Sequence, residues 1–249
     1  MHRIAICVAV AAALAGAGIS CVIPRPDLRE MTLLSNEYAF RHPATPDAIG
    51  SPDWTVTSGS LYRHGDYLWS GTPDASPPGP SSARGTDSAV LRAVRAGSGY
   101  TDVSVRFDLH VNGLTTTART PARDFDGVHV MLRYTSERSA YFVSVSRRDG
   151  LLVIKRKTAG GPSNGGTYRT LAMAPAPLPA PRSVWRHVEA TIRGSAAVRV
   201  TVRIDGFAAL QAVDHTAPGD SVAGQVGLRG DNCDFIIRGF RISPPATLL

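Results

Sequence analysis

The 249-residue sequence predicts an all-β protein, a two-sheet antiparallel β-sandwich. Short runs of β-branched and aromatic residues recur along the chain, and several of them alternate between apolar and polar side chains as half-buried strands do. The 24 glycines and 18 prolines supply the turns and loops between these runs. No segment after the N-terminal leader has a convincing helical period. Strands joined by long loops, about a dozen in all, favour two packed sheets.

The first 20 residues have the pattern of a secretory signal peptide. A short positive region is followed by an apolar run over residues 4–14, which is too short to cross a bilayer as a helix, and then by small residues that suit a signal peptidase. We therefore expect residues 1–20 to be removed and the mature chain to be secreted, either extracellular or associated with a cell wall.

Cys21 has two alternative roles in the mature chain. The run GISC at 18–21 resembles a lipoprotein box, although Gly18 stands where that pattern has Leu, Val or Ile. Alternatively, Cys21 forms a disulfide with Cys233, the only other cysteine that remains after the leader is removed. The two roles exclude each other because they use the same sulfur. A membrane is expected as a partner only through a lipid on Cys21.

The rest of the chain divides into a lead or tether at 21–34, one sandwich domain at 35–243 and a tail at 244–249. The clearest strand is 102–111, where five apolar residues alternate with polar ones and so share one face. Long loops are predicted at 71–87, 112–125 and 158–167, and a proline-rich connector at 174–181. The other predicted strands are 36–41, two strands within 53–62, 67–69, three runs within 123–158, 185–193, 197–204, 207–213, 224–229 and 235–242.

Three motifs resemble a known family. They are WTVTSGSLYR, the pair FDGVHVMLRY and AYFVSVSRRDG, and the closing GQVGLRGDNCDFIIRGFRI. Together they resemble the concanavalin A-like lectin/glucanase jelly roll and, more narrowly, secreted bacterial LamG-like domains, over residues 36–243. The resemblance implies a curved sheet whose concave face often receives a glycan. It implies no activity, because the fold hosts lectin-like modules, hydrolases and lyases.

The densest set of ionisable and aromatic side chains lies at 123–158. If a hairpin closes at 135–139, Arg133 lies opposite Tyr141 and His129 lies opposite Val145. One sheet face then carries His129, Arg133, Tyr141 and Arg147, which suit a sugar because a ring stacks on its apolar side and a guanidinium bridges hydroxyls or a carboxylate. These four residues are the candidate ligand-binding face.

The alternative is that Tyr141 and Met131 belong to the core and that Arg133 only satisfies a loop carbonyl. Lys155 is a further ligand-binding candidate, and its face depends on the preceding turn. If Asp149 and Gly150 form a two-residue turn, Lys155 faces away from His129. If the turn is one residue earlier and Gly150 is a bulge, Val153 and Lys155 share the His129 face.

The sequence does not decide whether the protein is an enzyme. A glycoside hydrolase needs two carboxylates about 5–10 Å apart, and the Glu-x-Asp-x-x-Glu run of hydrolases of this fold is absent; Asp124 and Asp126 are its nearest imitation. In a lyase, His129, Tyr141 and Arg133 would act as base, proton donor and uronate-neutralising group. The Gln-Ile-His motif of alginate lyases of this fold is Gly127-Val128-His129 here, so its glutamine is missing.

No cofactor is expected apart from a structural calcium ion as one alternative. Many sandwiches of this type bind calcium where the first and last strands meet, and Glu37, Asp231 and Asp234 offer hard oxygen ligands in suitable places. Equally, Asp231 begins what could be a simple turn. No cluster of cysteine and histidine has zinc spacing.

The formal charge is +7, yet only Lys155 and Lys157 among the 27 basic residues are lysine, and the arginines are spread along the chain. We therefore expect no nucleic acid as a partner. The expected partner is a polysaccharide or oligosaccharide, and in one version of the hypothesis it is anionic. The protein is expected to be a monomer. The tryptophans are expected mainly in the core. A carbohydrate-binding protein acting at an extracellular or cell-wall polysaccharide is the leading hypothesis, with a lyase and a structural or protein-interaction domain as alternatives.

Overall fold

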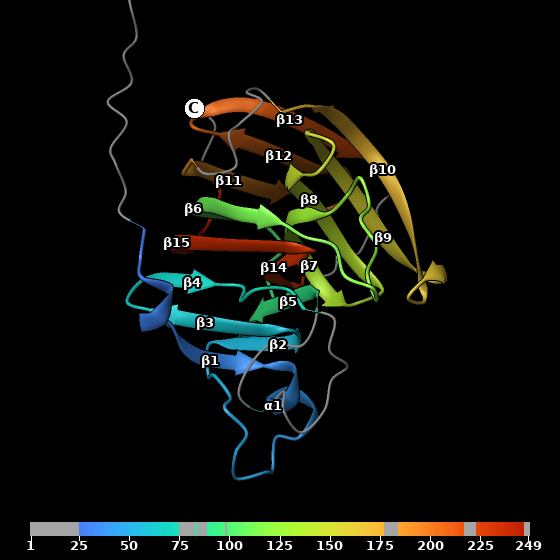
Figure 1. Cartoon of the computed structure of the whole chain (residues 1–249). Helices are drawn as coiled ribbons and strands as arrows, with labels where there is room; N and C mark the ends of the chain where they lie inside the picture. The colour runs from blue at the N-terminus through green and yellow to red at the C-terminus, as the bar shows by residue number, and fades with distance from the viewer. Residues whose placement is uncertain are drawn as a thin grey trace, which may run out of the picture.

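The computed structural model describes residues 25–74, 83, 89–97, 99–176, 184–216 and 223–246. It is a two-layer β-sandwich whose named strands pair only in antiparallel fashion (Figure 1). The predicted fold class is confirmed. The predicted signal peptide and Cys21 lie outside the described residues, as do parts of the predicted loop 71–87 and of the connector 174–181.

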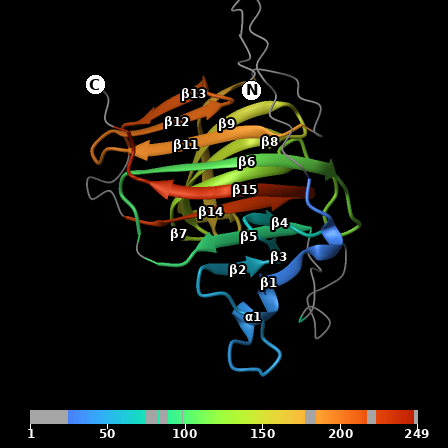
Figure 2. The same cartoon turned by 90° about the vertical axis from the view of Figure 1, so that its left-hand side faces the viewer.

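Strands from both ends of the chain meet in the first sheet, so the last long strand, β15, lies between β4 and β6 (Figure 2). The eight strands, in spatial order, are β1 (Thr32–Asn36), β3 (Ser60–His64), β4 (Tyr67–Trp69), β15 (Cys233–Ser243), β6 (Val103–Leu114), β11 (Arg186–Arg193), β12 (Val198–Ile204) and β13 (Phe207–Asp214).

The second sheet has seven strands and contains the central stretch of the sequence as three consecutive neighbours, β7, β8 and β9. The strands, in spatial order, are β10 (Gly166–Pro175), β9 (Leu151–Ser163), β8 (Ser139–Arg147), β7 (Gly127–Ser136), β14 (Gln225–Asp231), β5 (Val90–Arg95) and β2 (Trp54–Ser58). Two short helical segments lie near the start of the chain, the 3₁₀ turn η1 (Leu28–Glu30) and α1 (Glu37–Arg41).

Several predicted elements differ from the structure. The expected strand at 36–41 is helix α1, because the side chain of Asn36 caps it by accepting a hydrogen bond from the backbone N–H of Ala39 at 2.9 Å. Strand β1 begins at Thr32, inside the expected tether, and β5 and β10 were not predicted. The expected loop 158–167 is largely a hairpin between β9 and β10, in which Gly160, Gly161 and Gly165 adopt positive φ angles.

The core lies between the sheets and follows the predicted alternation. All five apolar residues of the 102–111 repeat are buried in it, with Phe107 only 1% exposed. Trp54 and Cys233 also lie in this core, at 5% and 2% exposure. Trp69 and Trp185 do not belong to the core and are half-buried elsewhere. The disulfide between Cys21 and Cys233 stays a prediction.

A buried carboxylate joins the two sheets along one edge. Asp214, the last residue of β13, has a fully buried side chain. It accepts hydrogen bonds from the hydroxyl of Tyr141 on β8 at 2.9 Å, from Arg156 on β9 at 3.0 Å and from Arg169 on β10. Burial alone would raise the pKa of Asp214, but bonds from Thr216, Tyr141 and Arg169 hold that pKa well below its usual range. The carboxylate is therefore ionised and fully paired.

No helix within the described ranges is long and apolar enough to cross a membrane.

The Asp214 contacts predict a pH-dependent loss of stability. Asp214→Asn should lower the free energy of unfolding at pH 7 by about 3 kcal/mol, because two arginines lose their buried partner. Since folding depresses the pKa of Asp214, its contribution is complete above the unfolded carboxyl pKa of about 3.9 and falls away as the pH drops toward the lower folded-state pKa. Urea unfolding of both proteins at pH 7 and pH 3 measures this. A stability difference that does not shrink at pH 3 would contradict the assignment.

Candidate functional site

The candidate site is the outer face of the seven-stranded sheet, the face turned away from the core. On β7, Val128 and Val130 point into the core, so His129 and Met131 point outward. His129 lies opposite Ser144 on β8 and Arg229 on β14, which places these side chains in one row across three strands. We call this surface the outer face.

A small second hydrophobic cluster covers the middle of the outer face. Phe142 and Tyr168 pack edge to face in it, with ring centroids 5.5 Å apart. Tyr168 is half-buried, so part of its ring reaches the surface. The cluster consists of Val94, Met131, Tyr134, Ala140, Phe142 and Tyr168.

Both lysines of the chain stand beside Tyr168. Lys155 and Lys157 alternate along β9 on the outer face, with their Nζ atoms 5.9 and 4.9 Å from the centroid of the Tyr168 ring. Burial lowers the pKa of each ammonium group, and neighbouring arginines lower both further. No carboxylate within the described part of the chain forms an ion pair with either lysine. We call these two residues the lysine pair.

A buried ionic row continues from the lysine pair across β14. Arg229 holds Asp231 through three contacts of 2.8–3.1 Å and donates a hydrogen bond to the Tyr168 hydroxyl at 3.4 Å. Burial alone would raise the pKa of Asp231, but Arg229 and His129 hold that pKa well below its usual range. Asp231 also raises the pKa of Arg229 against the effect of its burial. This row fixes a rigid polar floor beside the aromatic cluster.

His129 is buried in the same floor. Its Nδ1 lies 2.8 Å from Ser144 Oγ, and its Nε2 lies 3.2 Å from Asp231 Oδ2 but is not aligned for a hydrogen bond. Burial lowers the pKa of His129, and the Asp231 carboxylate only partly offsets that effect. The ring is therefore neutral at pH 7 and is held in the floor between Ser144 and Asp231.

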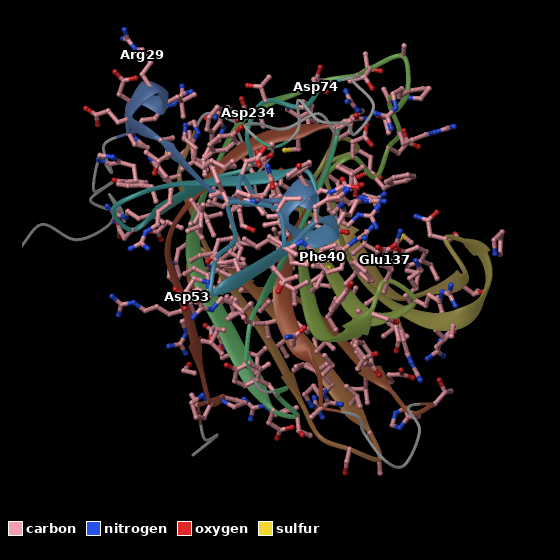
Figure 3. All side chains as sticks on the ribbon, turned by 90° about the horizontal axis from the view of Figure 1, so that it is seen from below. Arg29, Phe40, Asp53, Asp74, Glu137 and Asp234 are labelled. Carbon is pink, nitrogen blue, oxygen red and sulfur yellow. The ribbon has the colours of Figure 1, made fainter. Side chains whose placement is uncertain are left out.

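Arginines surround this floor on two sides. Arg147 pairs with Asp149, which lowers the pKa of that carboxyl group, while its Nη1 is fully buried without a hydrogen-bond partner. Arg92 pairs with Glu137 at the surface. Figure 3 labels Glu137 and, well apart from it in that view, Asp234 of the other sheet. The outer face therefore carries more basic than acidic side chains.

The predicted grouping of His129, Arg133, Tyr141 and Arg147 is wrong in two members. Tyr141 lies opposite Leu132 and faces the core, where its hydroxyl bonds to Asp214. Burial, with Asp214 beside it, raises the pKa of the Tyr141 hydroxyl. Arg133 donates to the carbonyls of Thr101 and Gly194 at 2.7 and 2.6 Å, at the end of the other sheet. The alternative, in which Arg133 satisfies loop carbonyls, is the one that the structure shows.

A β-bulge is the physical reason for this difference. Arg133 has a positive φ of 48°, and the register between β7 and β14 shifts between Gln225 and Gly227. The extra residue moves Arg133 off the outer face and places Tyr134 there instead. His129 lies opposite Ser144, whereas the hairpin expected from the sequence placed it opposite Val145. Only His129 and Arg147 of the four predicted residues share the outer face.

The turn before Lys155 has the form that places this lysine on the outer face. Gly150 has a φ of 74° and donates a hydrogen bond to the Arg147 carbonyl at 3.2 Å, so the turn lies at residues 148 and 149 with Gly150 as a bulge. Val153 pairs with Ser144, and Lys155 pairs with Phe142. Both therefore share the face of His129.

The three carboxylates predicted for calcium have separate partners. Glu37 binds Arg41 and the backbone N–H of Gly59, Asp231 binds Arg229, and Asp234 accepts from Trp69 and Asn112. Across the residues that the structure describes, no three His, Cys, Asp or Glu side chains gather as a metal ion requires. The structural calcium ion stays a prediction.

Lys157, Tyr168 and Arg229 were not identified as site residues from the sequence. Lys157 follows Lys155 at the strand period of two, and this spacing alone could have identified it. Tyr168 was missed because β10 follows a glycine-rich run that indicated a loop. Arg229 was missed because its place depends on β14 lying beside β7, and the sequence contains no local signal for that pairing.

Comparison with known proteins shows a shared fold. A carbohydrate binding module, CBM66, from Bacillus subtilis matches with a TM-score of 0.53 and 12% identity, over 77% of this chain and 95% of that one. The carbohydrate recognition domain of Emp46p in its potassium-bound form has a TM-score of 0.53 and 8% identity, over 78% of this chain and 90% of that one. The sequence matches no family model and no curated protein. The lectin-like sandwich is thus confirmed as a fold.

The environment of His129 predicts an unusual titration. Because burial lowers its pKa, the imidazole should gain a proton only well below the usual histidine pKa of about 6.5. NMR titration of the histidine ring signals measures this, and His129→Gln assigns the signal by removing it. A midpoint at or above 6.5 for that signal would contradict the buried, neutral imidazole.

Proposed function

We propose that this protein is a secreted carbohydrate-binding β-sandwich whose outer face binds an anionic extracellular or cell-wall polysaccharide. The observation that carries the proposal is the lysine pair beside Tyr168. Two ammonium groups that form no ion pair within the described residues lie beside a half-buried aromatic ring, with Lys155 half-buried and Lys157 buried at 3% exposure.

The charge of the outer face favours an acidic ligand. Burial disfavours the charged form of both lysines. The negative charge of an incoming carboxylate or sulfate would stabilise that charged form. Arg229 already has Asp231, and Arg92 already has Glu137. The lysine pair is therefore the part of the face with unmatched positive charge, and a polymer with regularly repeated acidic groups complements it.

The shape and chemistry of the same surface favour a sugar. An aromatic ring offers an apolar platform and, in Tyr168, a hydroxyl at its edge. Thr170 and the 59% exposed Met173 extend the surface along β10. A few placed polar groups around an apolar platform are the usual composition of a ligand site.

The proposed location follows from the N-terminal leader of the sequence. The pattern of residues 1–20 supports secretion, and Cys21 supports either a lipid anchor or a disulfide with Cys233. A monomer that binds polysaccharide at or outside the cell wall is consistent with both alternatives.

The lyase hypothesis receives no support from the positions of its three residues. His129 is on the outer face, whereas Tyr141 faces the core and Arg133 binds loop carbonyls. Base, proton donor and neutralising group therefore do not face one substrate. A binding function without cleavage is the better account. A structural or protein-interaction role becomes the better account if no polysaccharide binds.

Removing the lysine pair tests the proposal. Lys155→Ala/Lys157→Ala should weaken binding to a polyuronate such as alginate by roughly tenfold or more at low salt, because two charge-assisted contacts are lost. Affinity electrophoresis in alginate gels and calorimetry measure this, and the unsaturated-uronate absorbance should stay flat.

The matched control is Arg199→Ala/Arg203→Ala, which removes the same charge from exposed positions on β12 of the other sheet. It should leave binding nearly unchanged. Equal losses in both variants would mean that net charge and not the outer face governs binding. No retention of the wild type on acidic polysaccharides would reject the proposal.

A further inference from the structure

The outer side of the eight-stranded sheet carries a second group of aromatic side chains. His110 on β6, Ile236 on β15, Trp69 on β4 and Tyr62 on β3 lie in one row of paired residues across four strands. The apolar neighbours of His110 along β6 belong to the core, so this row points away from it. Ile236, which is part of this row, is fully buried.

The rings form two contacting groups on this face. Tyr62 and Trp69 have centroids 5.0 Å apart, Tyr67 and Trp185 are 6.1 Å apart, and Trp185 lies 5.2 Å from the ring of His110. The two tyrosines and two tryptophans are each half-buried, so their rings are packed at one side and open at the other. We call these five residues the aromatic patch.

Hydrogen bonds hold the polar edge of the patch. Trp69 Nε1 donates to Asp234 Oδ1 at 2.7 Å, and Asn112 Nδ2 donates to the same oxygen at 2.6 Å. Asn112 Oδ1 in turn lies 2.9 Å from His110 Nδ1. The carboxylate therefore fixes the orientation of the indole and places acceptor and donor atoms beside its ring.

A second set of polar groups lies next to Tyr67. Asp108 contacts His187 at 2.9 Å and Arg238 at 3.4 Å, and the Arg238 guanidinium lies 5.9 Å from the centroid of the Tyr67 ring. Two carboxylates therefore border the patch, Asp108 beside Arg238 and Asp234 beside Trp69. The patch therefore has no excess positive charge, in contrast to the lysine pair on the opposite face of the molecule.

We propose that the aromatic patch is a second binding site, and that its ligand is an uncharged glycan chain. Amphipathic rings in a row, bordered by fixed hydrogen-bonding groups, match a sugar ring with an apolar face and a rim of hydroxyls. The two carboxylates repel acidic polymers. This site is independent of the proposed function of the outer face, because it lies on the other sheet and has the opposite charge character.

Two sites on opposite sheets give the molecule a bridging capacity. One face takes an acidic polymer through charge, and the other takes a neutral polymer through stacking. A single sandwich then joins two chemically different polysaccharides without any second domain.

The tryptophans provide a direct test. Trp69 and Trp185 belong to the patch, whereas Trp54 is buried in the core at 5% exposure. Titration of the full mature chain with cellohexaose, laminarihexaose, xylohexaose and mannohexaose should give a saturable change in tryptophan fluorescence with at least one of them. Trp185→Ala should weaken this binding about tenfold or more, as truncation of a central aromatic contact does.

The controls separate this site from the outer face. Phe207→Ala removes a 71% exposed aromatic ring outside the patch and should leave the affinity unchanged. Lys155→Ala/Lys157→Ala should also retain hexasaccharide binding while losing alginate binding, and the hexasaccharide affinity should not change with added salt. If Trp185→Ala fails to fold, Tyr67→Ala serves as the test variant.

Three results would overturn the proposal. One is that none of the four neutral hexasaccharides binds to the folded protein. Another is that binding persists undiminished in folded Trp185→Ala and Tyr67→Ala. The third is that the hexasaccharide affinity falls together with alginate binding in the lysine variant, which would place both ligands on the outer face.

Discussion

The β-bulge at Arg133 decides what the two surfaces of the central strands contain. Side chains alternate along a strand, so one inserted residue exchanges the faces of everything beyond it. Before the bulge His129 faces outward, and after it Tyr134 does. Arg133 itself extends to the carbonyls of Thr101 and Gly194 and ties the end of β7 to the other sheet. The bulge thus places Tyr134 on the outer face, as the Gly150 bulge places Lys155 there.

Buried charges divide into structural and available groups. Asp214 and Asp231 are each matched by arginines, and burying them is tolerable only because those partners are fixed in place. The lysine pair has no such match within the described chain, although burial disfavours its charge. Within the fold these ammonium groups contact the Tyr168 ring, and ionisable groups with perturbed pKa values are common at surfaces that bind ligands.

The sequence predicts the sandwich well and the site only in part. Strict alternation at 102–111 identifies a half-buried strand without further information. The faces of Arg133 and Tyr141 depend on a bulge, and a bulge depends on the partner strand β14, which is about ninety residues away in sequence. Tyr168 follows a glycine-rich run in the sequence. The local propensity of such a run favours a loop over a strand. Local sequence patterns identify the residue types in a strand. They do not show which distant strand pairs with it, and this pairing decides the faces of Arg133 and Tyr141.

The bonds of Asp214 also protect the protein from unwanted association. A sheet edge with free backbone groups is a template on which another chain can add a strand. Asp214 draws the outermost strand of one sheet, β13, against β9 and β10 at the margin of the other. The two margins therefore contact each other along this seam. An open margin at this seam would instead offer backbone groups on which a second copy of the chain could add a strand.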